Sequence, residues 1–270
     1  MTFKRYNPDR INVLSSGGGT QSNAMIVLIS QGKLPKPDLI VMVDTEREMS
    51  NVFDYQREHI LPLCEAMGIE YHIIKKSEYT EHDLTTKNDD ERVLPPFFIV
   101  NDDTGEISKM PGFCSGKWKT EPFQRHINKL YGEKYATKRG VEVWLGITID
   151  EAQRVKVTGG KWNRVYPLVE MMLTRQMCIQ IVEDAGLPTP PRSHCWMCPN
   201  RHNNDWADMQ ANHPEEFAKA VEFEKNLIAK WPQYRVNRSA DPLGVQTFVD
   251  DGRGTQLDLI QFCDTGMCFT

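Results

Sequence analysis

Residues 10–31 read RINVLSSGGGTQSNAMIVLISQ, and this stretch decides the fold. Residues 10–16 are a short apolar run that ends in small side chains. Residues 21–31 carry apolar side chains at helical spacing, and three successive glycines separate the two segments. The pattern predicts a strand, a tight loop and a helix in direct succession.

The same alternation continues downstream. Residues 38–43 are a continuous apolar run of the kind that a parallel sheet buries on both faces, and the helical spacing of residues 51–67 ends at Gly68, a typical C-cap. Further strands are predicted at residues 70–74, 141–148 and 164–168, and further helices at residues 121–131 and 174–186. Residues 75–112 lose the pattern and are expected to form a long irregular excursion or lid. The alternation predicts an α/β fold with a doubly wound, mostly parallel sheet.

The C-terminal part has a different character. Residues 191–270 contain a cysteine pair, a helix predicted at residues 214–230 and a tail rich in turn residues, without alternation of strand and helix. We therefore predict an α/β domain over residues 1–190 and a smaller, irregular or helical, cysteine-rich region over residues 191–270.

Composition limits the class of protein. A chain of 270 residues with 40% hydrophobic content can bury a sizeable core. The formal charge of −5 gives no overall electrostatic attraction for a polyanion such as nucleic acid. A local basic stretch such as residues 117–119 could still contact one. No apolar run reaches about 18 residues, and the N-terminus lacks a secretory signal, so we expect a cytoplasmic protein without a membrane partner. Seven cysteines then indicate thiols or metal ligands more than disulfides.

The glycine-rich loop is the first candidate site. Glycines let the backbone approach a phosphate closely, and the free amides of a following helix N-terminus favour an anion. The loop lacks the Lys-Ser/Thr ending of a Walker A motif and the spacing of a dinucleotide fold. Read alone, it could also be only a flexible connection. The candidate ligand-binding residues are Ser15, Ser16, Gly17, Gly18, Gly19, Thr20, Gln21 and Ser22.

This loop resembles the PP-loop, SGGxDS, of ATP pyrophosphatases and of the related phosphoadenylylsulfate (PAPS) reductases. Aligned on Ser22, Gln21 occupies the Asp position of the motif and Gly17 the position of its first Ser. The resemblance implies an adenine nucleotide alpha hydrolase-like (HUP-like) domain. It further implies that the loop binds ATP with Mg²⁺ and that the bond between the α and β phosphates is cleaved.

Two further strings are similar to the same family. FCSGKWKTEP, residues 113–122, resembles a Cys, Lys and Pro string before a helix, which implies that Lys119 binds a phosphate or sulfate oxygen. GITIDEAQR, residues 146–154, resembles a Gly, acidic and Arg string after a strand. Gly146 would allow close approach of the nucleotide, and Arg154 would bind phosphate. Without the resemblance, Lys119 would be read as a solvent-facing lysine.

Asp44 and Thr45 follow the second predicted strand. By resemblance, Asp44 meets the adenosine or the metal, with Thr45 beside it in the binding site. Taken by itself, Asp44 could equally be a solvated carboxylate at a strand end. The resemblance thus implies Lys119, Arg154 and Asp44 as the catalytic residues.

The cysteines indicate a metal site. Cys195 and Cys198 form a CxxC turn, which directs two thiolates at one ion, and Cys263 and Cys268 lie in the tail. Zinc and a 4Fe–4S cluster both suit such a set, and the spacing does not choose between them. Two more cysteines, Cys64 and Cys178, fall within apolar helical patterns and are expected to be buried.

The family resemblance favours the cluster. PP-loop enzymes of sulfur chemistry often carry one, with a cysteine next to the lysine string as a ligand. The resemblance therefore implies Cys114, Cys195 and Cys198 as ligands, with Cys268 or Cys263 as the fourth.

The chain looks most like the PAPS reductase-like proteins of DNA phosphorothioation systems (Dnd or Ssp type). There, such a protein is an ATP pyrophosphatase thought to adenylate the DNA backbone, so that sulfur from a cysteine desulfurase can replace an oxygen. The resemblance implies DNA as acceptor, and the desulfurase and other proteins of such a system as partners. One alternative is a PAPS or adenylylsulfate reductase that uses Cys263 or Cys268. Another is a non-catalytic nucleotide-sensing or zinc-stabilised DNA-binding module.

Overall fold

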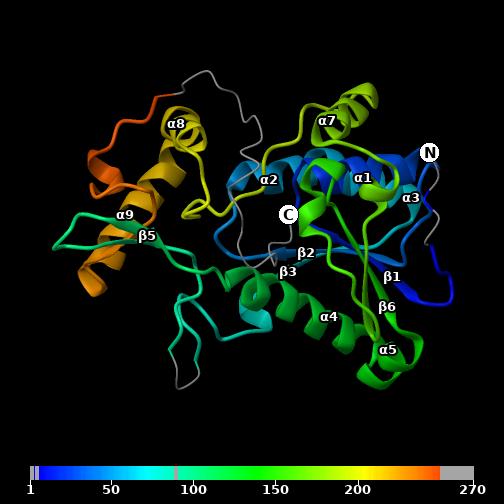
Figure 1. Cartoon of the computed structure of the whole chain (residues 1–270). Coiled ribbons are helices and arrows are strands. Elements are labelled where there is room, and N and C mark those ends of the chain that lie inside the picture. The colour runs from blue at the N-terminus through cyan, green and yellow to red at the C-terminus, as the bar shows by residue number, and fades with distance from the viewer. Residues whose placement is uncertain (1–2, 4–5, 88–90, 250–270) are drawn as a thin grey trace. The chain divides into compact units, whose positions relative to one another are not determined.

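The structure is a computed structural model that describes residue 3, residues 6–87 and residues 91–249 (Figure 1). The described residues form two compact units. Unit 1 combines the residues up to Glu81 with Lys117–Ser193, and unit 2 combines His82–Gly116 with the residues from His194 onward. In the described part of the chain, no helix is long and apolar enough to cross a membrane.

Unit 1 is built on a five-stranded sheet in the order β3-β2-β1-β6-β7. All of its strand pairs are parallel, which confirms the predicted α/β fold with a parallel sheet. The strands are β1 (Ile11–Ser16), β2 (Leu39–Asp44), β3 (Tyr71–Lys75), β6 (Val141–Leu145) and β7 (Trp162–Val165). The chain winds outward from β1 to β3 and then returns to β6 on the other side of β1. Ligands of such sheets bind where the winding direction changes, which here is at the carboxyl ends of β1 and β6.

Helices cover both faces of this sheet (Figure 1). One face is covered by α1 (Thr20–Ser30), α2 (Ser50–Tyr55), the π-helical turn Gln56–Ile60, α3 (Leu61–Met67), α6 (Pro167–Glu170) and α7 (Arg175–Asp184). The other face is covered by α4 (Glu121–Tyr131) and α5 (Glu133–Arg139). Successive side chains of a strand point to opposite faces, so β1 alone supplies Leu14 to the first core and Val13 to the second.

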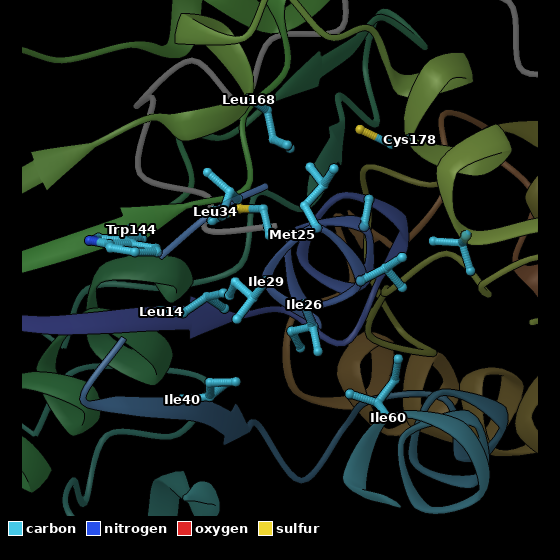
Figure 2. Close-up of a cluster of buried hydrophobic side chains, with 14 of the residues drawn as sticks. Leu14, Met25, Ile26, Ile29, Leu34, Ile40, Ile60, Trp144, Leu168 and Cys178 are labelled. Carbon is cyan, nitrogen blue, oxygen red and sulfur yellow. The ribbon is translucent and has the colours of Figure 1, made fainter. Parts of the chain in front are cut away.

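The helix that follows the glycine loop lies at the centre of the larger core. Ten of the eleven residues of α1 are buried. Figure 2 shows Met25, Ile26 and Ile29 of this helix among the strand residues Leu14 and Ile40. A helix that is buried on all sides is held rigidly by packing. The N-terminus of α1 is therefore fixed with respect to the sheet.

Unit 2 contains a small antiparallel sheet in the order β5-β4-β8 and two longer helices. Its elements are β4 (Phe98–Val100), β5 (Ile107–Lys109), α8 (Asn203–Asn212), α9 (Pro214–Lys230), β8 (Tyr234–Arg235) and the 3₁₀ turn Leu243–Val245. The expectation that residues 75–112 are wholly irregular is thus wrong. The two strands in this segment have only three residues each, too few to show an alternating pattern.

Several predicted boundaries also need correction. The predicted strand at residues 164–168 lies at Trp162–Val165, because Pro167 begins the short helix α6. The predicted strand at residues 141–148 ends at Leu145. The predicted helix at residues 51–67 contains the π-helical turn Gln56–Ile60. The predicted helices at residues 121–131 and 214–230 are confirmed with the same bounds.

Candidate functional site

The glycine loop between β1 and α1 depends on Gly18. Its φ of 75° lies in the left-handed region that favours glycine. A Cβ at this position would also lie 2.7 Å from Cγ1 of Val52 and 2.9 Å from Cε of Met42. Sequence alone left the flexible connection open as an alternative, whereas the structure shows a tight turn in which no other residue fits.

The loop leads into an N-terminus of α1 that no side chain caps. Gly19 is the N-cap residue and makes no side-chain cap hydrogen bond, and the first turn contains no acidic residue. The first amides of a helix have no acceptor within the helix and carry the positive end of its dipole. Ser22 donates its hydroxyl hydrogen to the carbonyl of Gly19 at 3.0 Å, which holds the turn closed. The arrangement presents backbone donors to an anion.

A buried polar network lies against the loop, and the sequence analysis did not identify it. Gln56 donates to the carbonyl of Gly18 at 3.1 Å and to Oδ1 of Asn23 at 3.2 Å. Asn23 donates to the same Gly18 carbonyl at 3.2 Å. The amide of Gly18 donates to Oγ of Ser16 at 3.1 Å. The hydroxyl of Tyr71 lies 3.0 Å from Oγ of Ser16 and 2.9 Å from Oε1 of Gln56.

Gly146, at the end of β6, lies directly against the N-terminus of α1. A Cβ at this position would lie 3.1 Å from the backbone nitrogen of Ser22 and 3.1 Å from Cβ of Gln21. The strand β6, which ends just before Gly146, pairs with β1, so the loop and Gly146 meet at the point where the winding of the sheet reverses. The structure therefore brings two of the strings that the sequence analysis selected to one place.

If the loop binds ATP, as its resemblance to the PP-loop implies, Gly146→Ala should weaken this binding by about 10-fold or more. The added methyl group would crowd the first turn of α1, where the resemblance implies the phosphates. Binding should be measured by calorimetry on the wild type and the variant. Gly159→Ala is the control, since a Cβ at Gly159 meets no atom within 4 Å. Equal affinities of wild type and Gly146→Ala would contradict this placement of the phosphates.

Arg154 and Glu151 lie near the loop through Gln21. Nε2 of Gln21 donates to Oε2 of Glu151 at 3.2 Å, and the guanidinium of Arg154 pairs with Oε1 of the same carboxylate at 2.9 Å. All three residues therefore belong to one network in which Gln21 stands at the Asp position of the PP-loop motif. Sequence reasoning selected Arg154 and Gln21, whereas the structure adds Glu151 as the residue that connects them.

Asp44 ends β2, the strand next to β1, and its side chain forms a turn. Its carboxylate accepts a hydrogen bond from the amide of Glu46 at 2.6 Å. Burial raises the pKa of Asp44 above its ordinary value of 3.8, with a contribution from the negative charge of Glu46, while the Glu46 amide, Lys75 and Lys76 act in the opposite direction. Thr45, the next residue, is 1% exposed. The sheet thus holds Asp44 at the same edge as the glycine loop.

Basic side chains gather around Trp118, the residue before Lys119. The guanidinium carbon of Arg47 lies 4.9 Å from the ring centroid, and the ammonium of Lys76 lies 5.3 Å from it. Trp118 and Lys76 are almost fully buried, and Lys119 is half-buried. The sequence analysis selected Lys119 but missed Arg47 and Lys76, which follow β2 and β3 and approach Trp118 only in the folded chain.

The three described candidate ligands Cys114, Cys195 and Cys198 all belong to unit 2. The amide of Cys198 donates to the carbonyl of Cys195 at 3.1 Å, which closes the CxxC turn, and Nε of Arg201 donates to the same carbonyl at 3.2 Å. Within residues 3, 6–87 and 91–249, no three His, Cys, Asp or Glu side chains are grouped so that they could hold a metal ion. The other candidates, Cys263 and Cys268, lie outside the described residues.

The remaining two cysteines are buried in unit 1, as predicted. Cys64 and Cys178 belong to the larger core, and their side chains are almost completely inaccessible. Burial raises the pKa of each thiol to about 12. Both side chains are therefore inert packing groups.

Comparison with known proteins gives only distant similarities. No protein-family model matches the chain, and no curated protein matches it in sequence. Among solved structures, the U34-tRNA thiolase NcsA from Methanococcus maripaludis, solved with its 4Fe–4S cluster, is 18% identical, covers 84% of this chain and 76% of its own, and has a TM-score of 0.44. PAPS reductase from Candida auris, in its phosphate complex, is 14% identical, covers 67% of this chain and 75% of its own, and has a TM-score of 0.39. Similarity at this level identifies no substrate.

Proposed function

We propose that unit 1 binds ATP at the glycine loop and transfers its adenylyl group to an acceptor, with release of pyrophosphate. The observation that carries this proposal is the uncapped N-terminus of α1, reached through a turn that only glycine permits at position 18. Gly146 packs so closely against the first turn of α1 that a side chain there would displace this turn. The resemblance of the loop to the PP-loop motif, with Gln21 at the Asp position and Gly17 at the position of the first Ser, favours ATP over other anions.

Adenylyl transfer requires no protein nucleophile. An oxygen of the acceptor attacks the α-phosphorus, the bond from that phosphorus to the bridging oxygen breaks, and pyrophosphate leaves with the electron pair. Positioning and charge stabilisation then account for most of the rate. We assign the pyrophosphate oxygens to the amides of Gly17 and of residues 19–22, because the amide of Gly18 donates to Ser16. We assign the charge that develops on the leaving group to Arg154 and Lys119. Mg²⁺, held by the phosphates together with Asp44, would neutralise further charge on the phosphates.

For the acceptor we propose the DNA backbone, with a cysteine desulfurase as sulfur source and other proteins of a DNA phosphorothioation system as partners. For unit 2 we propose a metal or 4Fe–4S site, with zinc as the alternative, that uses Cys114, Cys195, Cys198 and Cys268 or Cys263. The three described cysteines do not by themselves form a metal-binding group. We therefore assign no step of the reaction to a cluster.

The reaction is tested by supplying ATP labelled at the α-phosphate, with DNA but without a desulfurase, to protein purified without oxygen. We expect release of pyrophosphate and transfer of the label to DNA. Later addition of the desulfurase with its sulfur donor should release the label from DNA as AMP, because sulfur displaces the adenylyl group. If pyrophosphate is released but DNA is not labelled, the proposed cleavage of ATP is supported and DNA is not the acceptor. Absence of pyrophosphate release, or formation of sulfite from PAPS or adenylylsulfate with thioredoxin, would overturn the proposal.

We expect Asp44→Asn to lower Mg²⁺-dependent pyrophosphate release by at least about 10-fold, because the amide keeps the hydrogen bond from Glu46 but removes the charge that attracts the metal. The raised pKa of Asp44 gives a second readout. A proton competes with Mg²⁺ for the carboxylate, so the wild type should need a higher Mg²⁺ concentration for half-maximal activity as pH falls toward the raised pKa of the metal-free Asp44. The variant should lack this dependence.

The matched control is Asp54→Asn, which changes an exposed carboxylate of unit 1 that pairs with Arg57. We expect wild-type rates and an unchanged pH profile for this control. If Asp44→Asn releases pyrophosphate as fast as the wild type at every Mg²⁺ concentration, Asp44 does not bind the metal.

A further inference from the structure

The polar groups against the glycine loop form a closed ring when their hydrogens are counted. Oε1 of Gln56 can only accept, so the single hydrogen of the Tyr71 hydroxyl goes to it. The hydroxyl of Ser16 accepts from the amide of Gly18 and can donate its own hydrogen to the oxygen of Tyr71. The amide nitrogen of Gln56 completes the ring by donating to the carbonyl of Gly18. Every donor and acceptor that Gln56, Tyr71, Ser16 and Gly18 direct into the ring thus has a hydrogen-bond partner there.

This ring fixes the orientation of the peptide between Gly18 and Gly19. The carbonyl of Gly18 accepts from both Gln56 and Asn23, side chains that are completely buried, and therefore points into the protein. In a planar trans peptide the C=O and N–H bonds point in opposite directions. The N–H of Gly19 consequently points away from the buried network.

Gln56 reaches this position from the buried face of its helix. Its backbone amide donates to the carbonyl of Val52, four residues earlier, so Gln56 continues the α-helical register of α2. Residues four apart on a helix share a face, and Val52 and Gln56 are both completely buried. The π-helical turn begins at Gln56, and such turns often occur at functional sites. An uncharged amide, which can donate and accept at once, thus lies against the loop.

We infer that Gln56 is a positioning residue for polyphosphate binding, with Tyr71 and Ser16 as its supports. The inference rests on the proposed function, because the loop must bind phosphate oxygens for the orientation of the Gly19 amide to matter. Without the donor from Gln56, the Gly18 carbonyl keeps only the hydrogen bond from Asn23, and the Gly18–Gly19 peptide is held less firmly in the orientation that directs the Gly19 N–H away from the network. The expected consequence is weaker binding of any ligand with adjacent phosphate groups.

The test is Gln56→Glu, with binding of inorganic pyrophosphate measured by calorimetry from about pH 5.5 to about pH 8.5, a range in which buried glutamates titrate. The protonated carboxylic acid can donate one hydrogen to the Gly18 carbonyl, whereas the carboxylate has none and repels that oxygen. We expect the ratio of variant to wild-type affinity to fall by about 10-fold or more as pH rises. Because both proteins are measured with the same ligand at each pH, changes in affinity caused by protonation of pyrophosphate cancel in this ratio. Gln124→Glu on α4 is the control, and its ratio should stay constant.

Tyr71→Phe gives a second measurement that does not bury a charge. It keeps the ring shape of the side chain but leaves Oε1 of Gln56 without its donor, so pyrophosphate binding should weaken about 3- to 10-fold at every pH. Circular dichroism shows whether each variant is folded. Folded Gln56→Glu and Tyr71→Phe proteins that bind like the wild type at all pH values would overturn the inference and leave the proposed function standing. A wild type that binds neither pyrophosphate nor ATP would overturn both.

Discussion

Replacing Gly18 with alanine is expected to abolish ATP binding and to lower the free energy of unfolding of unit 1 by about 2–5 kcal/mol. Two costs add. An alanine at a φ of 75° is strained by about 1–2 kcal/mol. Its Cβ, 2.7 Å from Cγ1 of Val52, forces a shift in a packed core that costs about 1–3 kcal/mol. The shift displaces the loop itself, so binding is lost together with stability.

Gly32→Ala separates these two costs. Gly32 has a φ of 68°, similar to that of Gly18, but a Cβ there meets no atom within 4 Å. We expect this variant to lose about 1 kcal/mol of stability and to bind ATP normally. Denaturant unfolding followed by tryptophan fluorescence, with calorimetry of ATP binding, measures both effects. An affinity of Gly18→Ala equal to that of Gly32→Ala would show that the loop does not bind the nucleotide.

The structural features that could be predicted from the sequence are those that depend on a few consecutive residues. The glycine loop lies between an apolar strand and an apolar helix, so its place in a parallel sheet follows from local pattern. Gly68 has a φ of 67° after α3, as its expected role at a helix end requires. The strand before Asp44 is buried and parallel to β1, which puts this carboxylate at the ligand-binding edge. The polar residues at the strand ends can therefore be identified from local sequence pattern alone.

The features that sequence missed depend on contacts between distant segments. Gln56 is a polar residue within a predicted helix, and its partners Gly18 and Asn23 lie more than 30 positions earlier in the chain. Arg47 and Lys76 meet at Trp118 because of the register between neighbouring strands, which no single segment reveals. β4 pairs with β8 across more than half of the chain, and strands of two or three residues carry no periodic signal.

Glu224 is expected to be a sensitive residue of unit 2. It lies on α9 with 1% of its surface exposed, and its two carboxylate oxygens accept hydrogen bonds from the amides of Val236 and Leu243. A glutamine side chain at this position would offer one acceptor oxygen and turn an NH₂ group toward one of these amides. We expect Glu224→Gln to lose about 1–3 kcal/mol, measured as exchange of the Val236 and Leu243 amide hydrogens that is about 5- to 150-fold faster. Unchanged exchange would contradict this role.

The same carboxylate gives unit 2 a defined pH dependence. Burial raises the pKa of Glu224 above its ordinary value of 4.5, and the two amide hydrogen bonds only partly oppose this. Between 4.5 and the raised pKa, the native state holds a proton that the unfolded state has released, so stability falls as pH rises through this window. Glu224→Gln cannot titrate, and the stability advantage of the wild type over this variant should therefore shrink with rising pH.

Glu222→Gln, on the same helix but exposed, is the control and should show the wild-type pH profile. A difference between wild type and Glu224→Gln that grew with rising pH would mean that the amide hydrogen bonds outweigh the cost of burying the charge.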